Sequence, residues 1–410
     1  MMPSKEKAFA LSLIIPREQA KKARQKLEDN GLFDPTYKLS LLEGGCVAIP
    51  VKQDSMETVS CLWPDHVLKY LSLPLSQKIR AKSSTPASKL TRELESFMHQ
   101  RGISNELRRE IPKKWERHQD LVIIPASSFV SIEWEKITNL WELVARCLSC
   151  QRLARHAPIA NDNTRSSQVA LLLGNNGLVI HTDNGIRYSY DVTKCMFSAG
   201  NITEKLRIAS LDCTGETVVD LYAGIGYFTL PYLVHAGANH VHSCEWNPYA
   251  LSALRQNLHD NGVLDRCTVH QGDCRLLNLP PVADRVNLGL IPSSEDGWPT
   301  AIRVLREKGG VLHIHSNVEE SFASEDCTEL NTEVTALRTE NSSCLSGKDR
   351  LRHACRLWSS CTQEKILTLL HSIKGSRQWS VQQMHLEVIK SYAPHIVHVV
   401  LDLKCSPNDV

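Results

Sequence analysis

The feature that most constrains the fold is a regular alternation of short apolar runs with amphipathic segments between residues 201 and 318. Strands that are separated by helices favour a parallel sheet with helices on both faces. The apolar runs predict strands at Thr217–Tyr222, His240–Cys244, Cys267–His270, Arg285–Leu290 and Val311–His315. Helical periodicity predicts helices at Tyr227–Ala236, Tyr249–Asp260 and Trp298–Glu307.

Two further apolar runs, Leu386–Tyr392 and Ile396–Lys404, are joined by the tight turn Ala393–His395 and predict an antiparallel hairpin. We therefore expect an α/β fold: a doubly wound, mostly parallel, seven-stranded Rossmann-like sheet with a terminal antiparallel hairpin. A helix is expected over residues 363–374, and the polar, acidic residues 319–350 are expected to form a flexible insertion. A parallel sheet closed by such a hairpin is typical of S-adenosylmethionine-dependent transferases.

The remaining sequence predicts two smaller domains before the transferase domain. A small N-terminal α/β domain is followed by a polar linker at residues 82–89 and by an α+β domain that we expect to face a polyanionic partner. The expected domains are residues 1–80, 90–200 and 201–410. The elements expected in the first two are strands at Ala8–Ile15 and Cys46–Val51 and helices at Arg17–Asn30, Thr91–Gln100 and Trp134–Cys150.

The formal net charge of +2 conceals an uneven distribution of charged residues. Residues 1–200 contain 28 Lys and Arg against 21 Asp and Glu, whereas residues 201–350 contain 12 against 20. A basic front half is typical of chains that bind a polyanion. An alternative is an ordinary solvated surface, because Glu106, Glu110 and Glu116 interleave with the cations. The side chains expected to contact phosphates are Arg108, Arg109, Lys113 and Lys114.

Cysteine usage and hydropathy indicate the compartment. The 14 cysteines are irregularly spaced, and the apolar run Phe9–Ile15 is short, with no small-residue cleavage site after it. No apolar stretch approaches the ~20 residues that a membrane-spanning helix needs. We therefore expect reduced thiols in a cytoplasmic protein without membrane contact. Cys147 and Cys150 have C-x-x-C spacing, but no second pair matches it, so no metal is expected.

The sharpest local motif is Asp220-Leu-Tyr-Ala-Gly224-Ile-Gly226, which stands where a predicted strand gives way to a helix. Glycines at this position allow a ligand to approach the backbone, and the helix N-terminus offers free N–H groups. The dinucleotide fingerprint requires a third glycine where this chain has Thr229. The motif therefore favours an adenosine ligand that is smaller than a dinucleotide.

Acidic residues follow the next two predicted strands. Glu245 lies 25 residues after Asp220, where a carboxylate can accept hydrogen bonds from ribose hydroxyls. Asp273 follows the third strand, where a carboxylate can accept a hydrogen bond from an adenine amino group. Because open α/β sheets bind ligands at the carboxyl ends of their strands, these acids and the glycine turn predict an adenosine site. The alternative is that both acids only cap helices.

The fourth strand leads into Asn287-Leu-Gly-Leu-Ile-Pro292-Ser293-Ser294-Glu295. In sheets of this layout, the end of the fourth strand faces the reacting end of the cofactor. Amino-methylating enzymes often have an Asn/Asp-Pro-Pro-aromatic segment there, and this chain lacks it. The segment therefore predicts a chemistry other than ordinary N-methylation.

Several segments together resemble the wybutosine-synthesising protein 2 family of tRNA enzymes. The resemblance is strong over about residues 100–318 and 380–404 and weaker over residues 1–80. The motifs are specific enough to separate the chain from the sister family of tRNA guanine-37 N1-methyltransferases, which share the fold. The matching segments are Phe197–Arg207, Asp220–Pro231, Cys244–Pro248, Asn261–Cys267, Gly289–Glu295, Leu312–His315 and Lys390–His395.

The resemblance implies transfer of the 3-amino-3-carboxypropyl group of S-adenosyl-L-methionine, with release of 5′-methylthioadenosine. The implied acceptor is C7 of 4-demethylwyosine at position 37, in the anticodon arm of tRNA(Phe), and we expect the enzyme to act as a monomer. Lys205 could also pair with the methionine carboxylate. The cofactor contacts that the resemblance implies are Ser198, Lys205, Glu245, Asp273 and Cys274, which join Asp220, Gly224 and Gly226.

Catalysis of such a transfer depends largely on positioning, because the carbon that faces the nucleophile in line with the sulfur is the one that reacts. We expect Pro292 and Ser293 to shape the pocket for the acceptor base, and Glu204 or Glu295 to assist proton loss from C7. Glu295 could instead only favour the start of the helix that follows it. Two other functions stay open on the sequence: guanine-37 N1-methyl transfer, and tRNA binding without catalysis.

Overall fold

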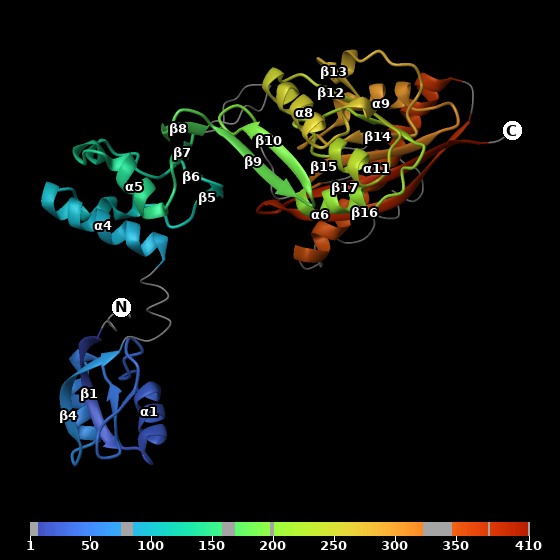
Figure 1. The fold of residues 1–410 in the computed structure, drawn as a ribbon. Helices are drawn as coiled ribbons and strands as arrows, with labels where there is room; N and C mark the ends of the chain where they lie inside the picture. The colour runs from blue at the N-terminus through green and yellow to red at the C-terminus, as the bar shows by residue number, and fades with distance from the viewer. Residues whose placement is uncertain are drawn as a thin grey trace. The chain divides into compact units, whose positions relative to one another are not determined.

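The computed structural model describes residues 7–74, 85–157, 169–196, 201–322, 347–375 and 378–408 (Figure 1). The chain divides into two compact units, and each is described by itself. The first unit comprises residues 1–114 with 127–149, and the second comprises residues 115–126 with 150–410. The three domains expected from the sequence, at residues 1–80, 90–200 and 201–410, stay a prediction.

The first unit contains an antiparallel sheet of β1 (Lys7–Pro16), β2 (Ser40–Leu41), β3 (Cys46–Pro50) and β4 (Val67–Pro74), with helices α1 (Ala20–Asp29) and α2 (Met56–Leu62). The strand order is β2-β3-β1-β4. Alternate residues of β1, Leu11, Leu13 and Ile15, are buried in one core with Leu27 and Val59. The sequence predicted β1, α1 and β3 but missed α2 and β4.

A buried carboxylate organises the rest of the first unit. Glu110 accepts hydrogen bonds from the backbone amides of Val130 and Ser131 at 2.8 and 2.9 Å, and from the indole Nε1 of Trp134 at 2.9 Å. Burial raises the pKa of Glu110, but these hydrogen bonds outweigh it and lower the pKa below its ordinary value. Glu110 is therefore an internal anchor and does not belong to the charged surface.

Two helices of the first unit, α4 (Pro86–Arg101) and α5 (Leu140–Leu148), pack against each other. The predicted helix Trp134–Cys150 was wrong at its N-terminal end. Residues Ile132–Lys136 form a separate 3-10 helix, and Asn139 has a left-handed backbone with φ of 59° that interrupts the chain before α5. The aromatic and aliphatic spacing is helical across this break, so periodicity alone could not reveal it.

Seven strands of the second unit form one sheet: β11 (Thr217–Asp220), β12 (His240–Glu245), β13 (Cys267–Gln271), β14 (Arg285–Leu288), β15 (Gly310–Glu319), β16 (Trp379–Ala393) and β17 (Ile396–Pro407). Their order is β13-β12-β11-β14-β15-β17-β16. The first five strands pair in parallel, and β17 pairs antiparallel with both β15 and β16. The expected α/β fold, with a mostly parallel seven-stranded sheet and a terminal hairpin, is confirmed.

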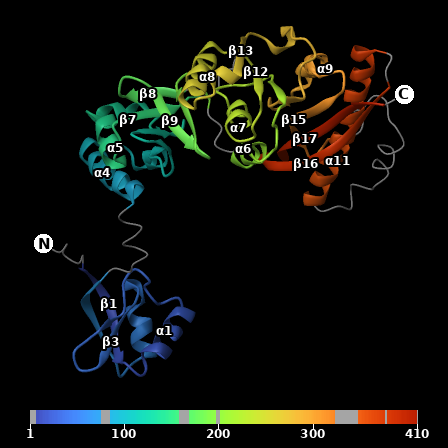
Figure 2. The ribbon, with the colours of Figure 1, turned by 45° about the vertical axis from the view of Figure 1, so that its right-hand side comes forward.

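Helices cover the sheet (Figure 2), and buried side chains form two separate cores between these helices and the sheet. They are α6 (Ile202–Ala209), α7 (Thr229–Val234), α8 (Pro248–Asp260), α9 (Trp298–Val304) and α11 (Gly347–Lys374). One core contains Leu230 of α7 and Leu254 of α8, and the other contains Trp298 of α9 and Trp358 of α11. Two cores of this kind are the arrangement of a doubly wound sheet.

Helix α11 is longer than the sequence indicated. The expected helix over residues 363–374 is only the C-terminal part of a helix of 28 residues. Its buried residues Trp358, Ile366 and Leu370 pack in the second core. The expected flexible insertion at residues 319–350 begins at the end of β15 and overlaps the start of α11, and its residues 323–346 lie outside the described residues.

A two-stranded hairpin of β9 (Leu178–Asp183) and β10 (Ile186–Asp191) is tied to α8 by two asparagines. Asn257 Oδ1 accepts a hydrogen bond from the backbone amide of Ser189 at 2.7 Å, and Asn261 Oδ1 accepts one from the amide of Arg187 at 3.0 Å. The Nδ2 of Asn257 also donates to the Ile225 carbonyl at 2.9 Å. One asparagine therefore connects this hairpin to the glycine-rich turn after β11.

A second small sheet in this unit has the order β5-β6-β7-β8. Its strands are β5 (Glu116–His118), β6 (Leu121–Ile124), β7 (Arg152–His156) and β8 (Val169–Leu173). Arg152 joins it to the hairpin, because its guanidinium pairs with Asp120 at 2.7 Å and donates to the Leu178 carbonyl at 2.7 Å.

A chain of buried charges connects α6 with the sheet. Arg207 of α6 donates to both carboxylate oxygens of Glu204, at 2.8 and 2.7 Å, and to Asp402 of β17 at 2.6 Å. Burial alone would raise the pKa of Asp402, but its contacts with His313 and Arg207 hold that pKa below its ordinary value. Asp402 therefore stays ionised between its two partners.

The chain of charges continues across β15 and β14. His313 Nδ1 lies 2.7 Å from Asp402 Oδ1, and Arg285 Nη1 lies 2.9 Å from His313 Nε2. Because a guanidinium can only donate, Nε2 accepts from Arg285, and Nδ1 carries the proton that it donates to Asp402. Arg285 also pairs with Glu216 at 2.9 Å. The network thereby fixes α6 against the central strands.

The imidazoles of His315 and His398 are buried and predict an acid-sensitive fold. Burial lowers the pKa of His398 to about 4 and that of His315 well below its ordinary value. The folded state keeps both rings neutral, so their contribution to stability is present above about pH 6.5, the unfolded-state pKa. It is lost as the pH falls towards about 4.

We therefore expect the melting temperature to drop between pH 6.5 and pH 4.5, and His398→Gln to flatten this dependence by about 3 °C per pH unit. The measurement is thermal unfolding of the full chain across that range. His259→Gln, which changes a ring whose side chain is 73% exposed, is the control and should leave the slope unchanged. An equal slope in all three proteins would contradict the prediction.

Candidate active site

The glycine-rich turn after β11 has a backbone that only glycine fits well. Gly224 has φ of 56° and Gly226 has φ of 103°. A Cβ at Gly224 would lie 2.6 Å from the Tyr227 ring, and one at Gly226 would lie 3.0 Å from Leu230. Both glycines are therefore required by the turn, and they leave its backbone open to close approach by a ligand.

Asp220 lies beneath this turn and is completely buried. Its carboxylate accepts hydrogen bonds from Asn287 Nδ2 at 3.0 Å and from Thr229 Oγ1 at 2.8 Å. Burial raises the pKa of Asp220, and these two hydrogen bonds oppose the shift. Asp220 therefore joins the end of β11 to β14 and α7. Thr229, which stands where a dinucleotide fold has glycine, supplies one of the two side-chain donors.

Glu245 ends β12 and reaches the glycine turn. Its Oε2 accepts a hydrogen bond from the Gly224 amide at 2.8 Å, and its Oε1 accepts one from the Asn247 amide at 2.8 Å. Burial raises the pKa of Glu245, and both amides oppose this by favouring the ionised form. Asn247, and not Glu245, caps α8. Each carboxylate oxygen retains a lone pair for a further donor such as a ribose hydroxyl.

Asp273 follows β13 and is paired within its own loop. Its carboxylate accepts hydrogen bonds from the Arg275 amide at 2.9 Å and from the Arg275 guanidinium at 2.6 Å. The hydrogen bond from the Arg275 side chain lowers the pKa of Asp273. Asp273 thus caps a short 3-10 helix, as the alternative interpretation expected, while the next residue, Cys274, is buried. Contact with an adenine amino group stays a prediction.

Lys205 is buried on α6 and faces the β9–β10 hairpin. Its ammonium forms an ion pair with Asp183 and lies 5.5 Å from the centroid of the Tyr188 ring. The sequence missed Asp183, because a contact between residues 22 positions apart leaves no local pattern. Ser198, the other contact expected before α6, lies outside the described residues.

The loop after β14 is fixed to β15. The Pro292 carbonyl accepts hydrogen bonds from the Asn317 amide at 2.8 Å and from Ser316 Oγ at 3.0 Å. Ser294 is buried and bonded to the His315 carbonyl at 3.3 Å. Pro292 and its neighbour Ser293 remain exposed on this anchored loop. The loop therefore presents a defined surface at the carboxyl edge of the sheet, where the glycine turn also lies.

The two candidate proton acceptors have opposite environments. Glu204 has no solvent exposure, and both of its oxygens bond to Arg207 within the buried ion network. Glu295 is exposed on the loop after β14, and its Oε1 lies 3.4 Å from Lys365 Nζ. Of the two, only Glu295 is placed where a substrate could reach it. Glu204 has the contacts of a structural residue.

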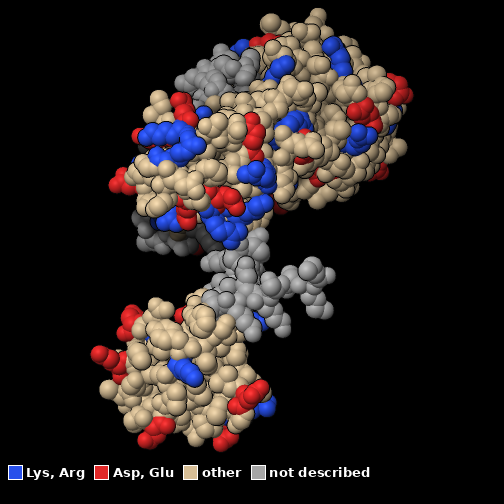
Figure 3. Space-filling model, turned by 60° about the vertical axis from the view of Figure 1, so that its left-hand side comes forward, with Lys and Arg blue, Asp and Glu red and all other residues tan. Residues whose placement is uncertain are grey.

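The predicted phosphate contacts lie in the first unit and are all exposed: Arg108, Arg109, Lys113 and Lys114. Arg108 forms an ion pair with Glu95. Glu110 is one of the three acids that interleave with these cations in the sequence, and it is buried. The exposed surface of this segment is therefore more basic than the sequence suggested. Figure 3 shows Lys and Arg side chains interspersed with Asp and Glu on the face that it presents.

Comparisons with known proteins identify the family. A TRM5/TYW2 methyltransferase domain matches residues 179–340, a TYW2 N-terminal domain matches residues 94–177, and a tRNA methyltransferase 5 N-terminal domain matches residues 13–59. The tRNA wybutosine-synthesizing protein 2 homolog of Rattus norvegicus is 44% identical, and the match covers 98% of each chain. The chain belongs to the tRNA wybutosine-synthesizing protein 2 family. The homolog of Danio rerio is 47% identical, with 96% of this chain and 98% of that one covered.

Solved structures of relatives agree with this assignment. TYW2 of P. horikoshii in complex with MeSAdo is 26% identical and has a TM-score of 0.54, and the match covers 77% of this chain and 99% of that one. Trm5b from Pyrococcus abyssi is 22% identical with a TM-score of 0.56, covering 97% and 99% of the two chains, and supports the fold. The resemblance found in the sequence motifs is therefore confirmed.

Two features are absent from the described residues. None of their helices has both the length and the apolar character needed to cross a membrane. Their His, Cys, Asp and Glu side chains form no cluster of three suited to a metal ion. Cys147 is buried and Cys150 is half-buried, and both are free thiols.

The Glu245 contacts predict a loss of cofactor affinity in Glu245→Gln. A glutamine places an NH2 group against one of two backbone N–H donors, which repels it, and removes the charge that strengthens a ribose hydrogen bond. We expect S-adenosylmethionine to bind at least about tenfold more weakly in calorimetry. Glu307→Gln, an exposed acid of the same unit, is the control. Equal affinity in the three proteins would remove Glu245 from the cofactor site.

Proposed function

We propose that the protein transfers the 3-amino-3-carboxypropyl group of S-adenosylmethionine to C7 of 4-demethylwyosine at position 37 of tRNA(Phe). The observation that carries this proposal is membership of the tRNA wybutosine-synthesizing protein 2 family at 44–47% identity over nearly the whole chain. The bound molecule of the P. horikoshii relative, MeSAdo, is methylthioadenosine, the nucleoside that such a transfer leaves behind.

The carboxyl edge of the sheet supplies the cofactor site. The amides of the glycine turn and the carboxylate of Glu245, joined at 2.8 Å, form one side of it. Asp273 and Cys274 follow β13 on the adenine side. Lys205 provides a buried cation for the methionine carboxylate, and its pairing with Asp183 holds the ammonium in place before the cofactor binds. S-adenosylmethionine supplies the activated carbon, and these residues decide which carbon is presented.

The loop after β14 supplies the acceptor side. Pro292 and Ser293 are exposed on a loop whose backbone is bonded to β15, so the base meets a rigid surface. Attack by C7 forms the new C–C bond, breaks the Cγ–S bond and leaves a proton on C7. Glu295 is an accessible carboxylate on this loop, and we assign it the role of proton acceptor.

The same proposal includes the contacts with the tRNA, the oligomeric state and the compartment. The exposed cations at Arg108, Arg109, Lys113 and Lys114 contact phosphates of the anticodon arm. The enzyme acts as a monomer in the cytoplasm. The alternative activity, guanine-37 N1-methyl transfer, suits the fold, but the loop Leu290–Glu295 lacks the Asn/Asp-Pro-Pro-aromatic segment of amino-methylating enzymes.

The proposal is tested by incubating the protein with tRNA(Phe) that carries 4-demethylwyosine and with S-adenosylmethionine labelled separately in its methyl and carboxyl positions. The carboxyl label should enter the tRNA and the methyl label should not. Entry of the methyl label instead would establish methyl transfer and overturn the proposal.

The role of Glu295 is tested in the same assay with Glu295→Gln. Loss of the proton acceptor should lower kcat about 100-fold, with little change in the KM for S-adenosylmethionine. Asp296→Asn is the control, because Asp296 is the neighbouring acid on the loop and its side chain is 80% exposed. Full activity of Glu295→Gln would remove Glu295 from the mechanism.

A further inference from the structure

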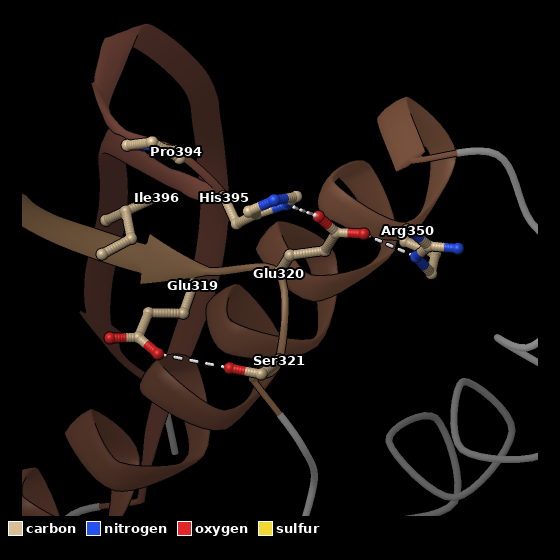
Figure 4. Close-up of a pocket in the computed structure, with 7 residues that line it drawn as sticks. All are labelled: Glu319, Glu320, Ser321, Arg350, Pro394, His395 and Ile396. Carbon is tan, nitrogen blue, oxygen red and sulfur yellow. Dashed lines mark hydrogen bonds and ion pairs between the residues drawn. The ribbon is translucent and has the colours of Figure 1, made fainter.

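A groove of about 450 Å³ lies where β15 ends, beside the β16–β17 turn and the start of α11 (Figure 4). It is next to the loop that we assign to the acceptor base, because β15 residue Asn317 bonds to the Pro292 carbonyl only two residues before the groove begins. The groove therefore lies at the same edge of the sheet as the site itself. It is lined by Glu319, Glu320, Ser321, Arg350, Pro394, His395 and Ile396.

One carboxylate holds the two planar side chains of this groove. Glu320 Oε2 lies 2.5 Å from His395 Nδ1, and Glu320 Oε1 lies 2.5 Å from Arg350 Nε. The backbone of Glu320 is also fixed, since its amide donates to the His395 carbonyl at 2.8 Å. Figure 4 shows the imidazole and the guanidinium on opposite sides of the Glu320 carboxylate. Both planar groups are thus oriented before any ligand binds.

The planar groups remain accessible although Glu320 orients them. The His395 side chain is 77% exposed and that of Arg350 is 43% exposed. Unpaired bases of RNA stack on histidine rings and on guanidinium planes. Because Glu320 already restricts both side chains, stacking a base on them costs less conformational entropy than ordering free side chains would.

The acidic residues of the groove determine which part of a nucleotide fits. Two carboxylates, Glu319 and Glu320, line it, and they repel a phosphate. Glu319 is exposed, and its Oε2 accepts a hydrogen bond from Ser321 Oγ at 3.2 Å. A carboxylate of this kind accepts hydrogen bonds from the exocyclic amino groups of adenine, cytosine or guanine, which uracil lacks.

We propose that this groove binds an unpaired, amino-bearing nucleobase of the RNA substrate, next to the base that is modified. His395 and Arg350 stack on the base, Glu320 orients them, and Glu319 selects for the amino group. This assignment rests on the proposed function, because it takes the substrate to be the single-stranded loop of a tRNA.

The experiment compares binding of fluorescent oligo(A) and oligo(U) hexamers to the full chain by anisotropy. The two probes carry the same phosphate charge, so phosphate contacts cancel in the ratio of their affinities. The wild type should prefer oligo(A). His395→Asn, which keeps a residue that tolerates the positive φ of 63°, and Glu319→Ala should each reduce that preference at least about fivefold.

The matched controls are His385→Asn and Glu387→Ala, which change a His–Glu pair on β16 outside the groove. Both should keep the wild-type preference. An unchanged oligo(A)/oligo(U) ratio in His395→Asn and Glu319→Ala would overturn the groove assignment, as would equal losses in the controls. Affinities that change by the same factor for both probes in Glu319→Ala would leave the ratio unchanged. That result would indicate a general electrostatic effect and would also overturn the groove assignment.

A second readout separates failure of the groove from failure of the proposed function. The KM for tRNA should rise at least about fivefold in His395→Asn, while the affinity for S-adenosylmethionine in calorimetry stays at the wild-type value. If the wild type transfers the carboxyl label but the variant has an unchanged KM, the groove assignment fails alone. If the wild type transfers no carboxyl label, the proposed function fails, and the hexamer ratio still decides the groove.

Discussion

The site depends on one buried carboxylate, that of Asp220. It receives hydrogen bonds from Asn287 of β14 and Thr229 of α7, and so it fixes the ends of two adjacent strands and the start of a helix. A buried carboxylate without such donors would be costly, and the two polar partners offset much of that cost. The glycine turn and the loop after β14, to which we assign the cofactor and the acceptor base, both begin at this point.

The face of the sheet around Asp220 is unusually polar. Towards the opposite end of the strands, the network of Glu216, Arg285, His313, Asp402 and Arg207 crosses β14, β15 and β17 and ends at Glu204 of α6. Buried ion pairs are weak evidence for stability, because desolvation opposes them. Their geometry is directional, however, and here it fixes α6, the helix that carries Lys205. We infer that the network positions Lys205, the cation that we assign to the methionine carboxylate.

The sequence predicted the parts of the structure that depend on short-range patterns of residues. Strand and helix alternation predicted the sheet, and the Asp220–Gly226 motif predicted the glycine turn that Glu245 contacts, since these features depend on residues near one another in the chain. The helical spacing of aromatic and aliphatic residues continues across the break at Asn139, and it therefore predicted a helix that is too long. The Lys205–Asp183 pair and the burial of Glu110 are tertiary contacts, which no local pattern encodes.

We propose that the site presents Cγ, and not the methyl carbon, of S-adenosylmethionine to the acceptor base. The most direct measurement is identification of the nucleoside by-product by chromatography and mass spectrometry after reaction with tRNA(Phe) that carries 4-demethylwyosine. Transfer of the aminocarboxypropyl group must release 5′-methylthioadenosine in amounts equal to the modified tRNA. Release of S-adenosylhomocysteine in its place would show that the methyl group moved and would contradict transfer through Cγ.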